Sequence, residues 1–137
     1  MRALGIALAL LAQAARPPAT QFHARLSPVP VETSTAPKIT GTGAVTAVLM
    51  GSTLVISGTF EGMKSPATIA QVHMGQRGVR GPVEFDLTID KRASGTVSGS
   101  IALTRIQIDT LRRGWYYIQI HAEQAPDGNL WGWLLPQ

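Results

Sequence analysis

The chain contains no cysteine among its 137 residues. This absence excludes a disulfide scaffold, a thiolate metal site, an iron–sulfur cluster and a cysteine nucleophile. Charged residues are also few, at 15% where globular proteins average about 25%, which argues against a disordered chain or a coiled coil. Apolar residues reach 45%. That fraction is enough for a core, and the length fits one domain of about 100–200 residues.

The N-terminal residues have the pattern of a secretory signal peptide. Arg2 precedes an apolar run, Ala3–Ala12, that is shorter than the roughly 20 residues a bilayer span needs. Ala12-Gln13-Ala14 follows as a small-x-small cleavage site. A buried N-terminal helix is the alternative, but the two prolines at 17–18 would stop it. We expect residues 1–14 to be a cleaved signal peptide, 15–20 a linker and 21–137 the domain of a secreted or periplasmic bacterial protein.

Most of the remaining chain alternates between apolar and polar residues with period two. The alternation is strict in Thr53–Phe60, Val83–Asp90 and Gly95–Leu103, which indicates antiparallel strands with one buried face and one solvated face. In Val83–Asp90 the apolar residues at 83, 85, 87 and 89 are predicted to point inward. Weaker patterns predict further strands at Gln21–Leu26, Gly43–Met50, Ile69–His73, Trp115–His121 and Asn129–Leu135, the last two joined by a turn at Pro126-Asp127-Gly128.

One segment, about 104–113, has helical signals instead. Thr104 and Gln107 have the spacing of a capping box, and Gly114 is a typical residue for the helix end. About eight short strands at spacings of about 8–12 residues predict an all-β, immunoglobulin-like, antiparallel Greek-key β-sandwich with one short helix.

The closing strands predict a binding surface. With Ile118 and Ile120 in the core, their neighbours must point outward, and the same alternation applies to the adjacent strands. Exposed aromatic rings beside imidazoles and amides are typical of a binding surface. The alternative is that Trp131 and Trp133 only cover the flank of the fold, or stack on proline and arginine side chains. The predicted ligand- or partner-binding residues are Gln71, His73, Tyr117, Gln119, His121, Asn129, Trp131 and Trp133.

The order of these elements resembles the CHRD (chordin-type) domain over roughly Phe22 to Pro136. The matching segments include Phe22–Ser27, Gly41–Ala44, Ser57–Phe60, Ser65–Thr68, His73 with Gly75, Gly78 and Gly81-Pro82, Leu103-Thr104, Gly114–His121, Pro126–Gly128 and Gly132. The resemblance implies a sandwich similar to immunoglobulin or Cu,Zn superoxide dismutase domains. It also implies a secreted bacterial member, relatives such as chordin that bind growth factors, and no established reaction.

The chain departs from that family where chemistry would be expected. The family usually has His-x-His where this chain has Gln71-Val72-His73, and Asn where it has Gln119. Its last strand tends to read Gly-Glu-Ile-Arg-Gly-Gln, whereas here Trp131 and Trp133 stand at the arginine and glutamine positions. These replacements put a family-type polar site in doubt.

Metal binding is the alternative function for this surface. His73 and His121 offer two imidazoles, which suit copper or zinc, and methionines 63 and 74 could add thioethers. Two histidines are too few for a closed tetrahedral site, so both rings could instead hydrogen-bond the backbone and order the 75–82 loop. The ligand count also argues against superoxide dismutation, and no Gly-x-Ser-x-Gly motif indicates a hydrolase.

The formal net charge is +4 and the isoelectric point about 10.1. This excess favours contact with an anionic polymer, although ordinary solubility would also explain it. The candidate anion contacts are Arg77, Arg80, Arg112 and Arg113. Export and the lack of a recognition helix argue against nucleic acid as a partner. No segment after the predicted signal peptide is apolar enough to span a membrane. The sequence therefore predicts a non-enzymatic binding module without a cofactor, unless copper or zinc binds. Its partner would be an extracellular or periplasmic protein or a cell-surface polymer.

Overall fold

The computed structural model describes residues 17–137. The predicted signal peptide and the first two residues of the predicted linker lie outside the described residues. The elements are β1 (Gln21–Pro28), η1 (Ala36–Lys38), β2 (Thr42–Met50), β3 (Thr53–Glu61), β4 (Ala67–Met74), β5 (Val83–Ile89), β6 (Gly95–Ala102), α1 (Arg105–Arg112), β7 (Tyr116–Ala122), β8 (Ala125–Trp133) and β9 (Leu135–Pro136).

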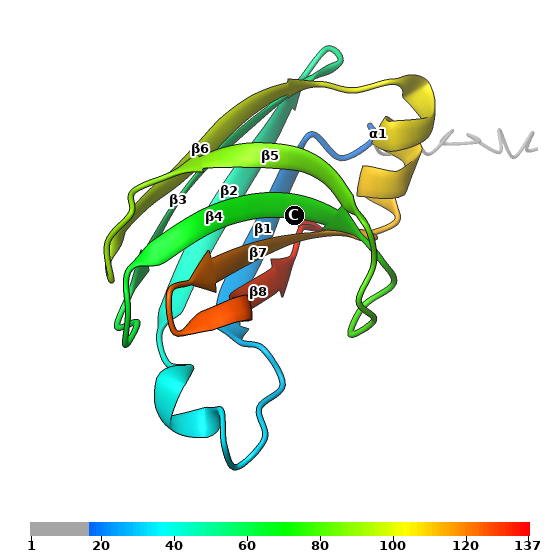
Figure 1. Ribbon diagram of the computed structural model, residues 1–137. Helices are drawn as coiled ribbons and strands as arrows, with labels where there is room; N and C mark the ends of the chain where they lie inside the picture. Colours follow the sequence, from blue (N-terminus) through cyan, green and yellow to red (C-terminus); the bar gives the residue numbers. More distant parts are fainter. Residues whose placement is uncertain (1–16) are drawn as a thin grey trace, which may run out of the picture.

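The strands form one antiparallel sheet that closes on itself. The order is β2-β3-β6-β5-β4-β7-β8-β1-β9, and an additional pairing of β2 with β1 closes the first eight of these strands into a ring. The two-residue β9 pairs with β1 beside this ring. Figure 1 shows the strands curving around a common interior. The all-β class with one short α-helix is confirmed for the described residues, but the predicted two-layer sandwich gives way to an eight-stranded barrel. About eight strands enclose an interior that side chains alone can fill.

Closure depends on β1, which has a partner on both sides. Residues Gln21–Leu26 pair with β2, while Ser27 and Pro28 pair with Trp131 and Leu130 of β8. His23 also lies opposite Leu135 of β9. Period-two alternation is the same for a barrel and for a sandwich, because each has one buried face per strand. The sequence therefore had no signal for the double pairing of β1.

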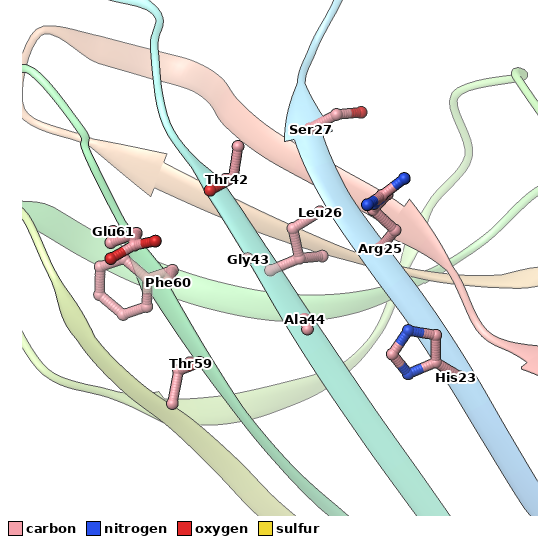
Figure 2. Close-up of a pocket in the computed structure, with 10 residues that line it drawn as sticks. All are labelled: His23, Arg25, Leu26, Ser27, Thr42, Gly43, Ala44, Thr59, Phe60 and Glu61. Atoms are coloured by element: carbon pink, nitrogen blue, oxygen red, sulfur yellow. The ribbon is translucent and has the colours of Figure 1, made fainter.

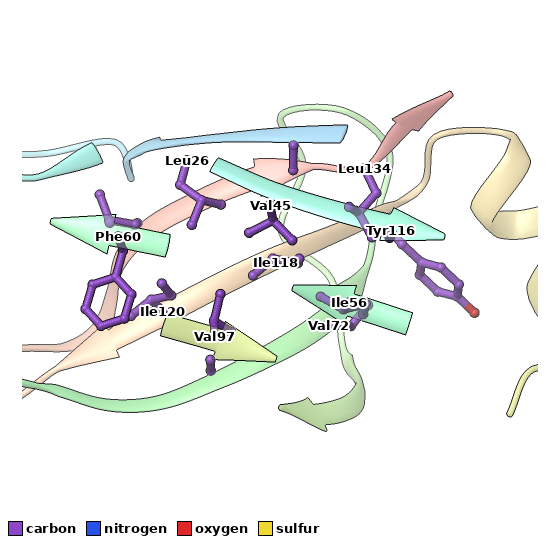
Figure 3. Packing of buried hydrophobic residues seen from close by; sticks show 14 of the residues in the cluster. Leu26, Val45, Ile56, Phe60, Val72, Val97, Tyr116, Ile118, Ile120 and Leu134 are labelled. Carbon is purple, nitrogen blue, oxygen red and sulfur yellow. The ribbon is translucent and has the colours of Figure 1, made fainter. Parts of the chain in front are cut away.

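The inward residues of the strands form the core (Figure 3). Leu54, Ile56 and Phe60 of β3 are buried, as are Ile118 and Ile120 of β7, in agreement with the predicted inward positions. The β5 strand differs from its clean pattern: Val83 is 48% exposed, and the other apolar residues of β5 are only partly buried. The reason is that β5 pairs with β6 only at Thr88–Ser98 and Ile89–Val97, so its first half has no partner on that side.

Helix α1 begins and ends where the sequence predicted. Thr104 accepts a hydrogen bond from the Gln107 backbone N–H, and the Gln107 side chain accepts one from the Thr104 N–H. Gly114 has a φ of 73°, in the left-handed region that glycine adopts without strain. Leu111 is the fully buried residue of the helix. Across residues 17–137 no helix is long and apolar enough to cross a membrane.

The β7–β8 hairpin turns earlier than predicted. Its turn lies at Glu123–Gln124, and Ala122 pairs with Ala125. The predicted turn segment Pro126-Asp127-Gly128 belongs to β8 instead. Gly128 has a φ of 135°, and a Cβ there would lie 2.9 Å from Gln119 Nε2. The glycine is therefore needed for the close approach of the two strands rather than for a turn.

Candidate functional site

Strand register brings most of the predicted surface residues together on the outer side of β4, β7 and β8. His73 of β4 lies opposite Tyr117 of β7, and Tyr117 lies opposite Trp133 of β8. Two residues away along each strand, on the same face, Gln71 is opposite Gln119, which is opposite Trp131. This outer face, with His121 at its end, is called the outer cluster below.

The outer cluster is largely covered, contrary to the predicted exposure. Tyr117 is 1% exposed, Gln119 3%, and His73 and Trp133 8% each. The residues between β4 and β5 cover it. Trp133 Nε1 donates to the Gly75 carbonyl at 2.9 Å, and Tyr117 Oη accepts from the Gly81 N–H at 2.9 Å. Alternation places a side chain on the outer face, but it does not show whether a loop folds back over that face.

Glycines allow the covering loop to lie this close. A Cβ on Gly81 would collide with the Met74 carbonyl oxygen, and one on Gly75 with the Val79 carbonyl oxygen. The polar edges of the aromatic rings then find partners in the loop backbone, as buried polar groups require. His73 Nδ1 also lies 2.9 Å from the Gly81 carbonyl oxygen, so His73 helps to fix the 75–82 loop to the barrel wall, as predicted. His121 does not share this role, because its Nδ1 lies 2.7 Å from the Pro126 carbonyl oxygen of β8 instead.

The aromatic members of the outer cluster support each other. The ring centroids of Tyr117 and Trp133 are 4.6 Å apart, and those of Trp131 and Trp133 are 4.8 Å apart in an edge-to-face arrangement. The Arg80 guanidinium lies 5.5 Å from the Trp131 ring centroid, within cation–π range. These contacts match the alternative interpretation of the sequence, in which the two tryptophans cover the flank of the fold and stack on arginine. Trp131 nevertheless keeps part of its surface in solvent.

Two of the predicted residues have structural contacts outside this aromatic group. Asn129 is fully buried and donates through Nδ2 to the Thr40 carbonyl at 2.9 Å, so it holds the loop before β2 and is not a surface residue. Gln71 is half-buried and donates to the Asp86 carboxylate on β5 at 2.9 Å. The Asn129 side chain is therefore closed to a partner, whereas Gln71 keeps part of its surface in solvent.

The four predicted anion contacts divide between two places. Arg77 and Arg80 lie in the 75–82 loop beside the tryptophans. Arg112 and Arg113 lie at the end of α1, where Arg112 Nε donates to the Ala19 carbonyl and the Arg113 guanidinium is 5.4 Å from the Trp115 ring centroid. The structure therefore does not give one patch of four arginines.

A groove of about 470 Å³ opens between β1, the end of the barrel wall and the 75–82 loop. No acidic side chain lines it. We call it the tryptophan–arginine groove; its lining residues are His23, Arg25, Ser27, Arg77, Gly78, Trp131, Gly132, Trp133 and Leu135. Sequence reasoning missed His23 and Arg25. Their outward position followed from alternation in β1, but their place beside Trp131 depends on the pairing of β1 with β8.

A second hollow, of about 560 Å³, lies on the other side of His23 and Arg25, over β1, β2 and β3. Figure 2 shows His23, Arg25 and Ser27 in a row along β1, facing Thr42 and Glu61 across the hollow. Its wall contains the acidic Glu61, and its one aromatic residue, Phe60, is turned into the core. The tryptophan–arginine groove is therefore the better candidate for ligand binding.

The histidines of the outer cluster lie near each other without further ligand residues. The His73 and His121 ring centroids are 6.4 Å apart. Within residues 17–137 no three His, Cys, Asp or Glu side chains gather into a metal site. Met63 is buried in the core, and Met74 packs against it, so no thioether joins the two rings.

The chain belongs to the CHRD domain family, whose family model matches residues 22–134. The match covers nearly the whole domain described above, including all strands of the barrel wall. Membership indicates a binding or interaction module. No curated protein and no solved structure matches the chain.

Proposed function

We propose that the chain is an exported, non-enzymatic binding module that holds an acidic cell-surface polysaccharide in the tryptophan–arginine groove. The observation that carries the proposal is the composition of the groove wall: two tryptophans and two arginines with no carboxylate among them. Family membership supports a binding role, and the signal-peptide pattern supports export, where such polymers occur.

The charge of the groove favours an acidic ligand. Arg25 and Arg77 lie on opposite sides of it, one on β1 and one in the 75–82 loop. A guanidinium can bind a carboxylate through two parallel hydrogen bonds. Acidic groups along a polymer would meet Arg25 and Arg77 in turn, whereas a neutral ligand would leave both unpaired.

The aromatic wall favours a ligand with flat apolar faces. Trp131 and Trp133 are held by each other, by Tyr117 and by Arg80. Trp133 is only 8% exposed, so Trp131, which keeps part of its surface in solvent, supplies the contact area, at little cost in conformational entropy. A sugar ring, with C–H groups on its faces and hydroxyl or carboxylate groups at its edge, fits the indole of Trp131 flanked by arginines.

The test is a binding titration of the full chain with polygalacturonate as the probe and dextran as the neutral comparison. Arg25→Ala, Arg77→Ala and Trp131→Ala are each expected to weaken binding about tenfold, the cost of a lost charge-assisted hydrogen bond or aromatic anchor. Binding should also weaken with added salt, because exposed charges are screened.

Arg113→Ala and Trp115→Ala are the matched controls, since this arginine–tryptophan pair lies at the end of α1. Unchanged binding in both is expected. Equal loss in the control and groove variants, or no polygalacturonate binding by the wild type, would contradict the proposal. Binding of polyglutamate in preference to polygalacturonate would replace the polysaccharide with an acidic protein partner.

A further inference from the structure

The second hollow lies in the path of a polymer that crosses the tryptophan–arginine groove. Its volume is about 560 Å³, and it shares His23, Arg25 and Ser27 of β1 with the groove. In the proposed function, on which this inference rests, the polymer runs from Arg77 on one side of the groove to Arg25 on the other. The second hollow begins at Arg25 on the far side of β1, so the next unit of the polymer reaches it.

A small side chain on the outer face of the sheet makes room for that unit. Strand register puts Arg25 of β1 opposite Ala44 of β2, and Ala44 opposite Thr59 of β3. Because neighbouring strands are about 4.8 Å apart, the backbones of Arg25 and Thr59 are about 10 Å apart, with only the methyl group of Ala44 between them (Figure 2). This width admits a sugar ring lying on the sheet.

The polar groups of the second hollow differ from those of the groove. Thr42 and Thr59 offer hydroxyl groups, and Glu61, opposite Thr42 in the ladder, adds a carboxylate. All three residues are exposed. A carboxylate only accepts hydrogen bonds, and it repels a second carboxylate. The second hollow therefore favours a sugar unit with hydroxyl or amide N–H donors and without an acidic group.

We propose that the second hollow is a subsite for an uncharged sugar unit, next to the acidic unit that Arg25 holds. The ligand class then narrows from acidic polysaccharides in general to those in which acidic and uncharged sugars alternate. Arg25 lines both hollows, so its guanidinium binds the acidic group while the next unit contacts Thr59 and Glu61. A uniformly acidic polymer also binds in the groove, but it places a carboxylate beside Glu61.

The experiment is a calorimetric titration of the full chain with two sets of fragments of equal length. Hyaluronan fragments alternate glucuronate with N-acetylglucosamine, whereas polygalacturonate fragments are acidic throughout, and the wild type is expected to bind hyaluronan more tightly. Glu61→Gln should bind polygalacturonate about threefold more tightly, because repulsion between exposed like charges is lost, and hyaluronan no more tightly. Glu123→Gln, in the exposed β7–β8 turn, should leave both affinities unchanged.

Fragment length gives a second measurement. Hyaluronan fragments long enough to leave the groove should bind the wild type more tightly than fragments of two units. Ala44→Tyr fills the floor of the second hollow, so it should remove this gain with length while short fragments bind as before. Ser98→Tyr places the same ring on the exposed outer face of β6, outside both hollows, and should keep the gain. Circular dichroism checks that each variant is folded.

Failure of the subsite and failure of the proposed function give different results. If neither polymer binds the wild type, or if binding does not depend on Arg77 and Trp131, the proposed function fails and the subsite fails with it. If both polymers bind through Arg77 and Trp131, but Ala44→Tyr keeps the gain with length and Glu61→Gln changes both affinities equally, only the subsite is refuted. Tighter binding of polygalacturonate than of hyaluronan to the wild type would contradict the choice of an uncharged unit.

Discussion

Tyr116 and Tyr117 are adjacent residues that are both nearly fully buried but on opposite faces of β7. Tyr117 lies under the 75–82 loop, where its hydroxyl group holds Gly81. Tyr116 points toward the core, where its ring meets Phe85 edge-to-face at 6.1 Å. Burial raises the pKa of Tyr116 to about 12, with a further contribution from the charge of Glu84. Two identical side chains therefore have different roles because strand alternation separates them.

The raised pKa of Tyr116 predicts a loss of stability in alkali. The unfolded tyrosine ionises near pH 10, whereas the folded one keeps its proton to about 12, so folding becomes less favourable as the pH rises between these values. The full loss is on the order of 2 kcal/mol. Urea denaturation of the wild type and Tyr116→Phe at increasing pH measures it. The wild type should lose more stability than the variant in this window, and parallel curves would contradict the assignment.

Helix α1 shows how local signals act at the scale of an element. It spans only Arg105–Arg112, too short to be stable alone. Its start is fixed by the capping box of Thr104 and Gln107, and its end by Gly114. Leu111 is its single fully buried anchor to the rest of the fold. With so little burial, the cap is a large share of what holds this element in place.

Thr104→Ala is therefore expected to destabilise the domain by about 1 kcal/mol, the usual cost of removing a capping hydroxyl group. Thr104→Ser keeps the hydroxyl group and should unfold like the wild type. Chemical denaturation of the three proteins makes the comparison. If Thr104→Ser lowers the free energy of unfolding as much as Thr104→Ala does, the capping hydroxyl group contributes nothing to stability. Packing of the threonine methyl group is then the cause of the loss.

The sequence predicted individual elements better than their arrangement. Period-two patterns located the strands, and the capping box located α1, because both signals lie within a few consecutive residues. Barrel closure was missed because it depends on β1 pairing with both β2 and β8, between segments that are far apart in the chain. The groove was missed for the same reason, since closure is what brings Arg25 beside Trp131.

Burial of the outer cluster was missed for a different reason. Tyr117, Gln119 and Trp133 lie on the outer face as alternation requires, and the sheet itself leaves them uncovered. The 75–82 loop supplies the cover through its backbone groups at Gly75 and Gly81. Such backbone contacts leave little trace in side-chain patterns. The outer cluster is thus a small second interior, and its edge at Trp131 and the arginines is open to a partner.

The most direct test of the account follows the indole N–H signals of the three tryptophans during titration of the full chain with polygalacturonate. Trp131 lies in the tryptophan–arginine groove, whereas Trp115 lies beside Arg113 at the end of α1. The account predicts that the nuclear magnetic resonance signal of Trp131 shifts in proportion to binding while that of Trp115 stays in place. Movement of the Trp115 signal alone, or saturable binding that leaves Trp131 unchanged, would contradict it.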